Sequence, residues 1–391
     1  MKQIERLRDW FLSEDKAYSR QAVYMLLVVI LALLFYLFAD FGAAGYDHND
    51  PSVMFFVICM VLVAVFLVIL FISHLIIFTV HKKRKKRQNT IMNGIPGGEG
   101  FAKIEPIKKG QSPDAKYYIE AAGGCKLLLR MTDIKEFERK QGEYNMLKRA
   151  HKLGVLVPEP VAFGLCGEGK HVYSLVGWIE GEDAETAMAR MDEEEQYHFG
   201  HKAGQLFRGM HVLPAPEGVE PWAARFRRKV QTRIDLYVKH ELFSEKGNRI
   251  VKYLRKNQDF LDGRPQTHWH GDMNVGNHII TPEGEIGAID FNHWNLDHGD
   301  PWWEFVIAPW GKEPPAHYFT GMIDGYFDDR PPCAFFEALA YYYACDALSA
   351  LCYTFLGSGP HTPEEGRRHL RNVLRWFDDM NNVVPSWYLK K

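Results

Sequence analysis

The stretch HGDMNVGNHII at residues 270–280, followed by IGAIDFN at residues 286–292, decides the fold of this chain. Asp272 and Asn277 stand five positions apart, so that one short loop carries the chain from a carboxylate to an amide. The run EIGAID has the apolar character of a short strand and ends at Asp290. We therefore expect a loop and a strand end to bring these three oxygen-bearing side chains into one cleft.

Phosphoryl transfer is the chemistry that needs this set of groups. One carboxylate orients the attacking hydroxyl and accepts its proton, and further oxygen ligands hold Mg²⁺ against the phosphates. Kinases place these groups in the pattern H-x-D-x-x-x-x-N, followed by an aspartate at a strand end. The sequence HGDMNVGN matches every fixed position of that pattern.

Two other interpretations of the stretch are weaker. A zinc site would draw on nearby histidines, namely His268, His270, His278, His293 and His298. However, His268 and His270 alternate along a strand and face opposite ways, and no H-E-x-x-H motif or cysteine pair accompanies them. A purely structural turn would explain HGD taken alone.

With these motifs, the chain from about residue 101 to its end resembles the aminoglycoside phosphotransferase family, kinase-like enzymes that include macrolide and choline kinases. The resemblance implies that Asp272 is the catalytic base and that Asn277 and Asp290 are metal ligands. It also implies that His270 orders the loop, with a core histidine as the equal alternative. Asp300, in the following GDP, would brace the loop.

The segment KKGQSPDAKYYI at residues 108–119 resembles the phosphate loop of the same family. The resemblance implies nucleotide contacts from Gly110, Gln111 and Ser112 in the turn, Arg130 on the next strand, Glu143 paired with it, and Trp178 at the hinge. Arg130 departs from the usual lysine, because a planar guanidinium differs from a point charge. Lys116 and Lys126 are alternative cations for that contact.

The implied fold class is α+β, a bilobal protein-kinase-like fold with a small antiparallel-sheet N-lobe at residues 101–180 and a mostly helical C-lobe at 181–391. The pattern agrees: three strands are expected between residues 101 and 133, then a helix and two more strands. Asp192 and Glu195 form a capping box before a buried helical stripe. The apolar segment 331–356 is interrupted by Glu337 and Asp346, which favours a core helix over a membrane span.

Two uncharged apolar runs, at residues 21–39 and 51–80, precede that domain and predict two transmembrane helices. The link between them is acidic, whereas HKKRKKR follows at residues 81–87 as a basic stop segment. The positive-inside rule then places both termini and the kinase-like domain in the cytoplasm, on a cell membrane. Residues 1–20 are interpreted as an interfacial helix and residues 88–100 as a flexible linker.

The expected reaction is transfer of the γ-phosphoryl group of ATP or GTP, with Mg²⁺, to a hydroxyl of an antibiotic, amino alcohol, sugar or lipid precursor. The formal net charge of −2 argues against nucleic-acid binding, so the expected partners are the acceptor and membrane lipids. The alternative is a membrane-tethered pseudokinase that binds nucleotide without turnover, which the arginine at position 130 favours.

The acceptor pocket has two candidate sets of side chains. An aromatic box for a quaternary ammonium would use Trp294, Trp302, Trp303 and Trp310. A carboxylate-lined pocket for a polycation would use Asp324, Asp328, Asp329, Glu304 and Asp346. Both sets have ordinary alternatives, since aromatic residues are mostly core and acidic runs mostly surface.

Overall fold

The computed structural model describes residues 92, 94–108, 110, 112–292, 297–307, 310–358 and 360–389, with scattered helical positions between Pro51 and Ser73. The chain divides into two compact units, Met1–Met92 and Asn93–Lys391. The predicted segments 1–20, 21–39 and 81–87 lie outside the described residues, as does most of 51–80. Among the residues that are described, no helix combines the length and the apolar character needed to cross a bilayer.

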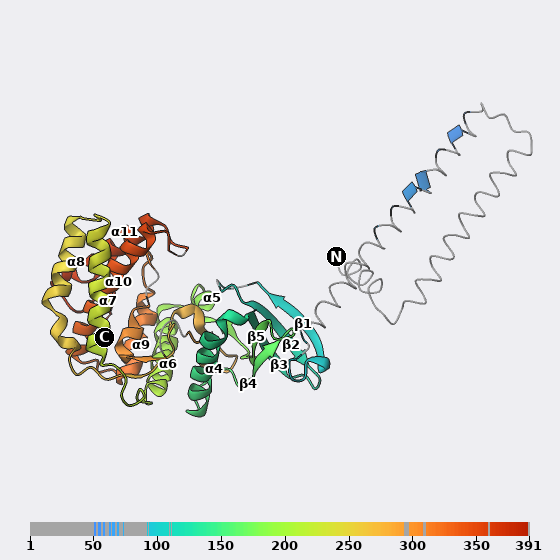
Figure 1. Cartoon of the computed structure of the whole chain (residues 1–391), viewed down its shortest axis with the longest axis horizontal. Helices are drawn as coiled ribbons and strands as arrows, with labels where there is room; N and C mark the ends of the chain where they lie inside the picture. The colour runs from blue at the N-terminus through green and yellow to red at the C-terminus, as the bar shows by residue number, and fades with distance from the viewer. Residues whose placement is uncertain are drawn as a thin grey trace, which may run out of the picture. The chain divides into compact units, whose positions relative to one another are not determined.

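The second unit begins with turns, the short 3₁₀ helix η2 (Gly98–Gly100) and a five-stranded antiparallel sheet (Figure 1). Its strands are β1 (Phe101–Ile107), β2 (Ala115–Ala121), β3 (Lys126–Asp133), β4 (Pro160–Cys166) and β5 (His171–Gly177). They lie in the order β1-β2-β3-β5-β4. The three strands expected before residue 133 and the two expected after the helix are therefore confirmed.

Strand β3 illustrates how side-chain alternation prepares the site. Leu127, Leu129 and Met131 are buried, whereas Leu128 and Arg130, at the intervening positions, line a cavity. This is the two-residue period of a strand with a packed face and a functional face. After the turn η3 (Ile134–Glu136), helix α4 (Phe137–Lys152) brings Lys140 and Glu143 to the same cavity.

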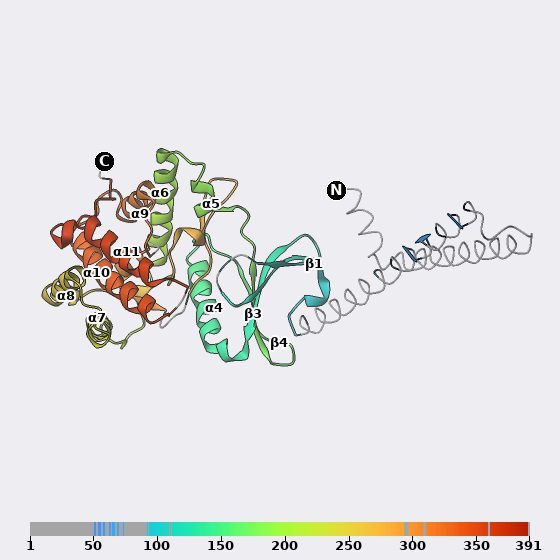
Figure 2. The same ribbon diagram turned by 90° about the horizontal axis from the view of Figure 1, so that it is seen from above.

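The rest of the unit is mostly helical, as predicted (Figure 2). Its longer helices are α6 (Glu193–Met210), α7 (Trp222–Lys239), α8 (Glu245–Lys256), α9 (Ala316–Phe327), α10 (Cys333–Phe355) and α11 (Pro363–Trp376). The capping box of Asp192 and Glu195 begins α6. Helix α10 is the buried centre of this lobe, since Tyr341, Tyr342 and Tyr343 are all at most 1% exposed. The expectation of a core helix at residues 331–356 is confirmed.

Helices α6 and α9 approach closely because glycines on each helix face the backbone of the other. A Cβ on Gly204 would lie 2.1 Å from the backbone oxygen of Met322, and one on Gly325 would lie 2.0 Å from that of His201. Real Cβ atoms do not approach that closely, so larger residues would force the helices apart. Phe207 of α6 then packs edge-on against His270, and in this way the helix pair supports the loop that carries the site.

Short elements complete the C-lobe and hold that loop. They are β6 (Glu182–Asp183), α5 (Ala184–Met188), η4 (Gln258–Leu261), β7 (Thr267–His268), η5 (Val275–Asn277), β8 (His278–Ile280), β9 (Ile286–Ala288), β10 (His298–Gly299), η6 (Pro301–Phe305) and η7 (Asp378–Met380). β7 pairs with β10, and β8 pairs with β6 and β9. The stretch between β7 and β8 is thus fixed at both ends.

Candidate active site

The HGD loop, residues 269–277, runs between β7 and β8. The side-chain amide of Asn277 donates to the backbone oxygen of Asp272 at 2.9 Å. Nδ2 of Asn274 donates to Oδ1 of Asp272 at 2.6 Å, and Oδ1 of Asn274 accepts from the backbone N–H of Gly276 at 3.0 Å. These hydrogen bonds draw the loop into one arrangement and leave the other carboxylate oxygen of Asp272, Oδ2, outside that network.

His270 connects this loop to the strand end that carries Asp290. Its side chain is fully buried, with Nε2 3.0 Å from the backbone oxygen of Ile289 and Nδ1 3.3 Å from the backbone nitrogen of Asp272. These partners define a tautomer in which Nε2–H donates and Nδ1 accepts. The backbone N–H of Ile289 also donates to the backbone oxygen of Asn277 at 2.9 Å. The position of His270 agrees with a loop-ordering role.

Asp290 lies just past β9 in a left-handed backbone conformation, with φ of 67°. Its carboxylate Oδ1 accepts a hydrogen bond from Nη1 of Arg130 on β3. The same guanidinium reaches Oδ2 of Asp114, at 3.1 Å from Nε and 2.8 Å from Nη2. A second cation, Lys140 on α4, donates to that oxygen at 2.6 Å. Arg130 therefore joins the two lobes.

The partner predicted for Arg130 was wrong. Glu143 forms ion pairs with Lys140 at 2.9 Å and with Arg139 at 2.5 Å. The carboxylates that pair with Arg130 are Asp114 and Asp290. A guanidinium on β3 reaches both the turn before β2, which carries Asp114, and the segment just past β9, which carries Asp290. Sequence reasoning missed Asp114 and Lys140. The K-x-x-E spacing of Lys140 and Glu143 on one helix face was the available signal.

Of the other predicted nucleotide contacts, Gly110 and Trp178 line one cavity, whereas Ser112 is not among its lining residues. Gly110 has φ of 100°, and Oγ of Ser112 accepts from the backbone N–H of Asp114 at 3.1 Å. Gln111 lies outside the described residues. At the opposite end, the backbone N–H of Trp178 donates to the oxygen of Lys126, while its indole packs edge-on against Tyr118.

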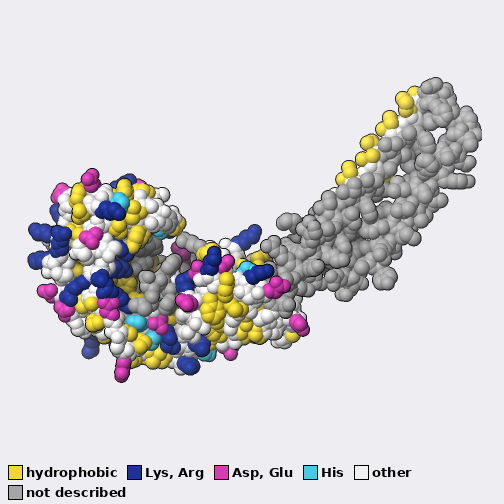
Figure 3. All heavy atoms as spheres, in the orientation of Figure 1, with side chains coloured by type: hydrophobic (Ala, Val, Ile, Leu, Met, Phe, Trp, Pro, Cys, Tyr) yellow, Lys and Arg dark blue, Asp and Glu magenta, His cyan; other side chains and the backbone are white. Residues whose placement is uncertain are grey.

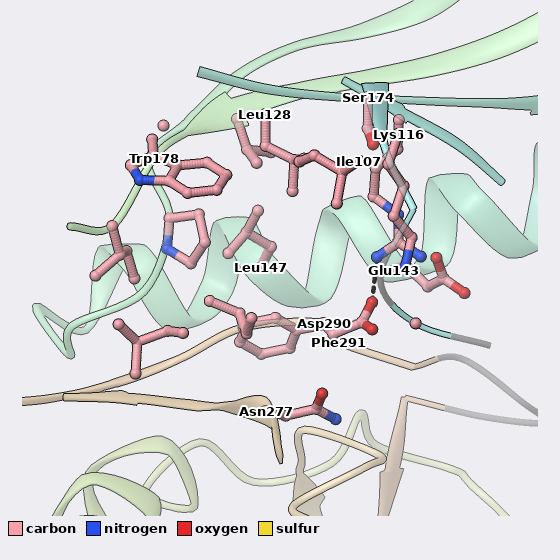
Figure 4. A pocket seen from close by; sticks show the side chains of 18 of the residues that line it. Ile107, Lys116, Leu128, Glu143, Leu147, Ser174, Trp178, Asn277, Asp290 and Phe291 are labelled. Carbon is pink, nitrogen blue, oxygen red and sulfur yellow. Dashed lines mark hydrogen bonds and ion pairs between the residues drawn. The ribbon is translucent and has the colours of Figure 1, made fainter. Parts of the chain in front are cut away.

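A cavity of about 360 Å³ brings most of these residues together (Figure 4). One end is apolar, with Leu128, Leu147 and Trp178 in its walls (Figure 4). The other end is polar and is lined by Gly110, Lys116, Arg130, Lys140, Glu143, Asn277 and Asp290. A flat apolar group and a chain of phosphates would fit this division of the cavity.

A second cavity, of about 520 Å³, lies on the other side of the HGD loop. Its described lining includes Gly271, Asp272, Met273 and Asn274 from the loop, Trp269, Trp303 and Trp310, and the carboxylate residues Glu304 and Asp346. Asp346 is held by the indole N–H of Trp310 at 3.1 Å and by Nε2 of His369 at 2.9 Å. The loop thus separates two cavities, with Asn277 facing one and Asp272 the other.

Only part of each predicted acceptor set lies at this second cavity. Trp303, Trp310, Glu304 and Asp346 line it, but Trp302 instead stacks under Arg264, whose guanidinium lies 3.5 Å from the ring centroid. Trp294 lies outside the described residues. Asp324 is buried against Tyr197 and Tyr388, and Asp328 and Asp329 pair with Arg208 and His201.

The loop is braced directly by Glu304 rather than by Asp300. Glu304 accepts from the backbone N–H of Gly271 at 2.6 Å and from that of His270 at 3.0 Å, and His211 holds it at 2.8 Å. Asp300 is fully buried and pairs with Arg264 at 2.6 Å, and it caps the short helix η6 that carries Glu304. The contact of Asp300 with the loop is therefore indirect.

The two aspartates of the site have opposite pKa shifts. Burial raises the pKa of Asp272 against the hydrogen bonds from Asn274 and Asn277 and the charge of His270, and the nearby charge of Asp290 adds a smaller contribution in the same direction as burial. Burial also acts to raise the pKa of Asp290, but the charge and hydrogen bond of Arg130, together with Lys116, outweigh it, so that the pKa lies below its ordinary value. A carboxylate that stays ionised is suited to a metal, and one with a raised pKa is suited to proton acceptance.

The donor set also fits magnesium. Within the described ranges, no group of three or more His, Cys, Asp or Glu side chains is placed to hold a metal ion. Asp290 and Asn277 offer one carboxylate and one amide oxygen, which is the small protein share that Mg²⁺ accepts when phosphates and water supply the rest.

The fold and this pair of cavities define a kinase-like phosphotransferase. A model described as the phosphotransferase enzyme family matches residues 103–336, more than half of the chain. The chain belongs to that family, in which an alcohol group is the acceptor, and the resemblance found in the sequence is confirmed.

Solved structures agree on the fold. The GDP complex of wild-type aminoglycoside 2'-phosphotransferase-IIIa is 14% identical and superposes with a TM-score of 0.52, over 76% of this chain and 98% of its own. A mutant of the same enzyme, also with GDP, is 12% identical with a TM-score of 0.55, over 76% and 99%. No curated protein sequence matches the chain.

Proposed function

We propose that this protein is a magnesium-dependent kinase that transfers the γ-phosphoryl group of ATP or GTP to a hydroxyl group of a small molecule. The observation that carries the proposal is the HGD loop between two cavities, with Asn277 on one side and Asp272 on the other. A nucleotide and an acceptor would approach the loop from opposite sides, as phosphoryl transfer in line requires.

The nucleotide would occupy the first cavity. Its base would fit the apolar end beside Trp178, and its phosphates would fit the polar end beside Lys116 and Asp290 (Figure 4). Asp290 and Asn277 are the residues that would hold Mg²⁺, which neutralises phosphate charge when bound. Arg130 occupies Oδ1 of Asp290 in this structure, so a metal held through that oxygen would compete with the ion pair.

The acceptor hydroxyl would meet Asp272. Oδ1 of this carboxylate is engaged by Asn274, so Oδ2 is the atom that would orient the hydroxyl and accept its proton. The raised pKa of Asp272 improves it as a proton acceptor. His270 and Glu304 hold the backbone of the loop in place while this happens.

The second cavity limits the acceptor to compounds that suit indole rings and a carboxylate. Trp269, Trp303 and Trp310 offer apolar faces, and Asp346 offers a fixed negative charge. An antibiotic, an amino alcohol, a sugar and a lipid precursor all combine hydroxyl groups with parts that suit such a surface.

The test is transfer of labelled phosphate from γ-labelled ATP or GTP to sugars, amino alcohols, aminoglycosides and macrolides. Magnesium-dependent transfer by the wild-type protein, abolished in Asp272→Asn, supports the proposal. The alternative, a pseudokinase, is favoured by Arg130 at the position of the usual lysine. Tight binding of the magnesium–nucleotide complex with neither transfer nor hydrolysis would establish that alternative.

We also propose that the enzyme is anchored to the cytoplasmic face of a membrane by residues 21–87. The support is the two uncharged runs and the basic segment after them. Large apolar side chains of the second run are also exposed to solvent, with Phe55 at 69%, Leu62 at 62% and Phe66 at 60% (Figure 3). A lipid phase would cover such side chains.

Anchoring is tested by fractionating cells that express the full chain. Sedimentation with membranes and resistance to alkaline carbonate are expected, and protease added outside spheroplasts should leave the kinase-like domain intact. Release by carbonate would refute the anchor, and digestion of the domain in intact spheroplasts would refute its orientation.

A further inference from the structure

Three cations line the polar end of the first cavity: Lys116, Arg130 and Lys140. Two of them are fully engaged by carboxylates. Arg130 pairs with Asp114 and Asp290, and Lys140 pairs with Asp114 and Glu143. Lys116 has no ion pair with any carboxylate among the residues that the structure describes. The polar end therefore has one cation whose charge is not taken up by a salt bridge.

Lys116 is also in the right place to contact phosphates. It lies on β2 directly across from Arg130 on β3, and its side chain enters the cavity beside Asp290 (Figure 4). A Cβ built on Gly110 would lie 2.6 Å from Nζ of Lys116, so the ammonium rests against the turn between β1 and β2. The absence of a side chain at Gly110 leaves room for that ammonium.

The surroundings favour an anion at this position. Desolvation and the neighbouring charge of Arg130 lower the pKa of Lys116, while Asp290 and Asp114 act in the opposite direction. A half-buried ammonium in this situation gains free energy from an incoming anion, because a charge-assisted hydrogen bond replaces lost hydration.

We propose that Lys116, rather than Arg130, is the cation that contacts the nucleotide phosphates, and that Arg130 holds Asp114 and Asp290 in position. The inference rests on the proposed function and names one binding residue of that site. The phosphate-binding cation would then lie on β2 instead of β3. Position 130 on β3 would not need a lysine, and its arginine can hold the two carboxylates. A lysine there would be unable to reach Asp114 and Asp290 with separate nitrogen atoms.

The test is calorimetric binding of ATP, ADP and adenosine to the full-length protein, in the wild type and in Lys116→Met. If Lys116 contacts phosphates, the variant should lose about 10-fold or more in affinity for ATP and ADP, with adenosine affinity unchanged. Lys103→Met is the matched control, because Lys103 is an exposed strand lysine paired with Glu105 and Glu120. It should bind all three ligands as the wild type does.

A structural role for Lys116 would give a different pattern. Equal losses for adenosine and ATP, or no loss for either, would overturn the inference while the proposed function stands. A wild-type protein that binds none of the three ligands would overturn the proposed function and this inference with it.

Chemical rescue gives a second, independent measurement. Lys116→Cys treated with 2-bromoethylamine regains an ammonium at nearly the original position, and its ATP affinity should return to within a few-fold of the wild type. The treated wild-type protein is the control, because Cys125 and Cys333 are exposed and would also react. Failure of rescue in a variant that still binds adenosine normally would count against a direct phosphate contact.

Discussion

The guanidinium of Arg130 in the sheet of the N-lobe forms an ion pair with the carboxylate of Asp290 in the C-lobe, 160 positions later in the chain. Arg130 is bound on its other side by Asp114, whose side chain is fully buried. One side chain thus links the two lobes and occupies the carboxylate proposed to hold magnesium. Its removal should affect stability and metal binding together.

Arg130→Met should lower the free energy of unfolding by about 3 kcal/mol, because it leaves the buried carboxylate of Asp114 with one cation fewer. Asp290→Asn should cost at most about 1 kcal/mol, because the Asp290 side chain is 37% exposed and Arg130 keeps Asp114. Chemical denaturation of the full-length variants measures both values. Equal losses of unfolding free energy in the two variants would show that the burial of Asp114 does not determine the size of the loss.

The same ion pairs predict the response of stability to acid. Desolvation acts to raise the pKa of Asp114, but Lys140 and Arg130 outweigh it, and the pKa of Asp290 is lowered by Arg130. Carboxyls with lowered folded-state pKa values stabilise the fold above their unfolded-state value of about 3.9, and this stabilisation is lost as pH falls through the folded-state values. The acid midpoint of unfolding should therefore lie at higher pH in Arg130→Met than in the wild type.

The activity of the enzyme should depend on pH through Asp272, which acts as a base only when ionised. Because burial raises its pKa, the acid limb of kcat/KM should lie above the ordinary aspartate value of about 3.9. The hydrogen bond from Asn274 opposes that shift, so Asn274→Ala should move the limb to still higher pH. An acid limb that stays in place in this variant would mean that another group titrates.

A change at Glu304 should affect turnover more than nucleotide binding. Glu304 binds the backbone of the loop at His270 and Gly271, and it does not line the first cavity. Glu304→Gln replaces one of two acceptor oxygens by a donor, and a displaced loop should reduce kcat about 100-fold. Nucleotide affinity should change little. Glu285→Gln, at an exposed carboxylate paired with Lys202, should leave both quantities unchanged. A loss confined to nucleotide affinity would argue against the bracing role.

Gly271, the glycine of the HGD motif, differs from an ordinary turn glycine in the space available to a side chain. Gly271 has φ of 86°, and a Cβ there would lie 2.0 Å from the backbone oxygen of Asn292. Gly263 has φ of 72°, with nothing within 4 Å of its Cβ position. Both alanine variants pay about 1 kcal/mol for the left-handed conformation, but only Gly271→Ala should lose phosphate transfer. Similar activity in the two variants would remove the steric argument.

The sequence predicted those parts of the molecule that depend on local spacing. The order of strands and helices, the capping box at Asp192 and the loop from His270 to Asn277 all follow from periodicity or from a motif with fixed positions. A loop of this kind positions its residues with its own backbone, as the hydrogen bond from Asn277 to Asp272 shows.

Side-chain partnerships between distant segments were not predictable in the same way. Glu143 was expected to pair with Arg130, yet Lys140 on the same helix takes its carboxylate, while Arg130 reaches Asp114 and Asp290. Each of these choices depends on which face of α4 meets β3 and on how the lobes close. The bracing carboxylate was placed at Asp300 for the same reason, because the sequence does not show that η6 presents Glu304 to the loop.

The most direct measurement of the central claim is the dependence of nucleotide affinity on magnesium. We predict that Mg²⁺ strengthens ATP binding to the full-length wild-type protein by about 10-fold or more, and that Asp290→Asn removes this effect while metal-free binding persists. A variant that keeps the full magnesium effect would contradict the assignment of Asp290, with Asn277, as the metal-holding pair of this site.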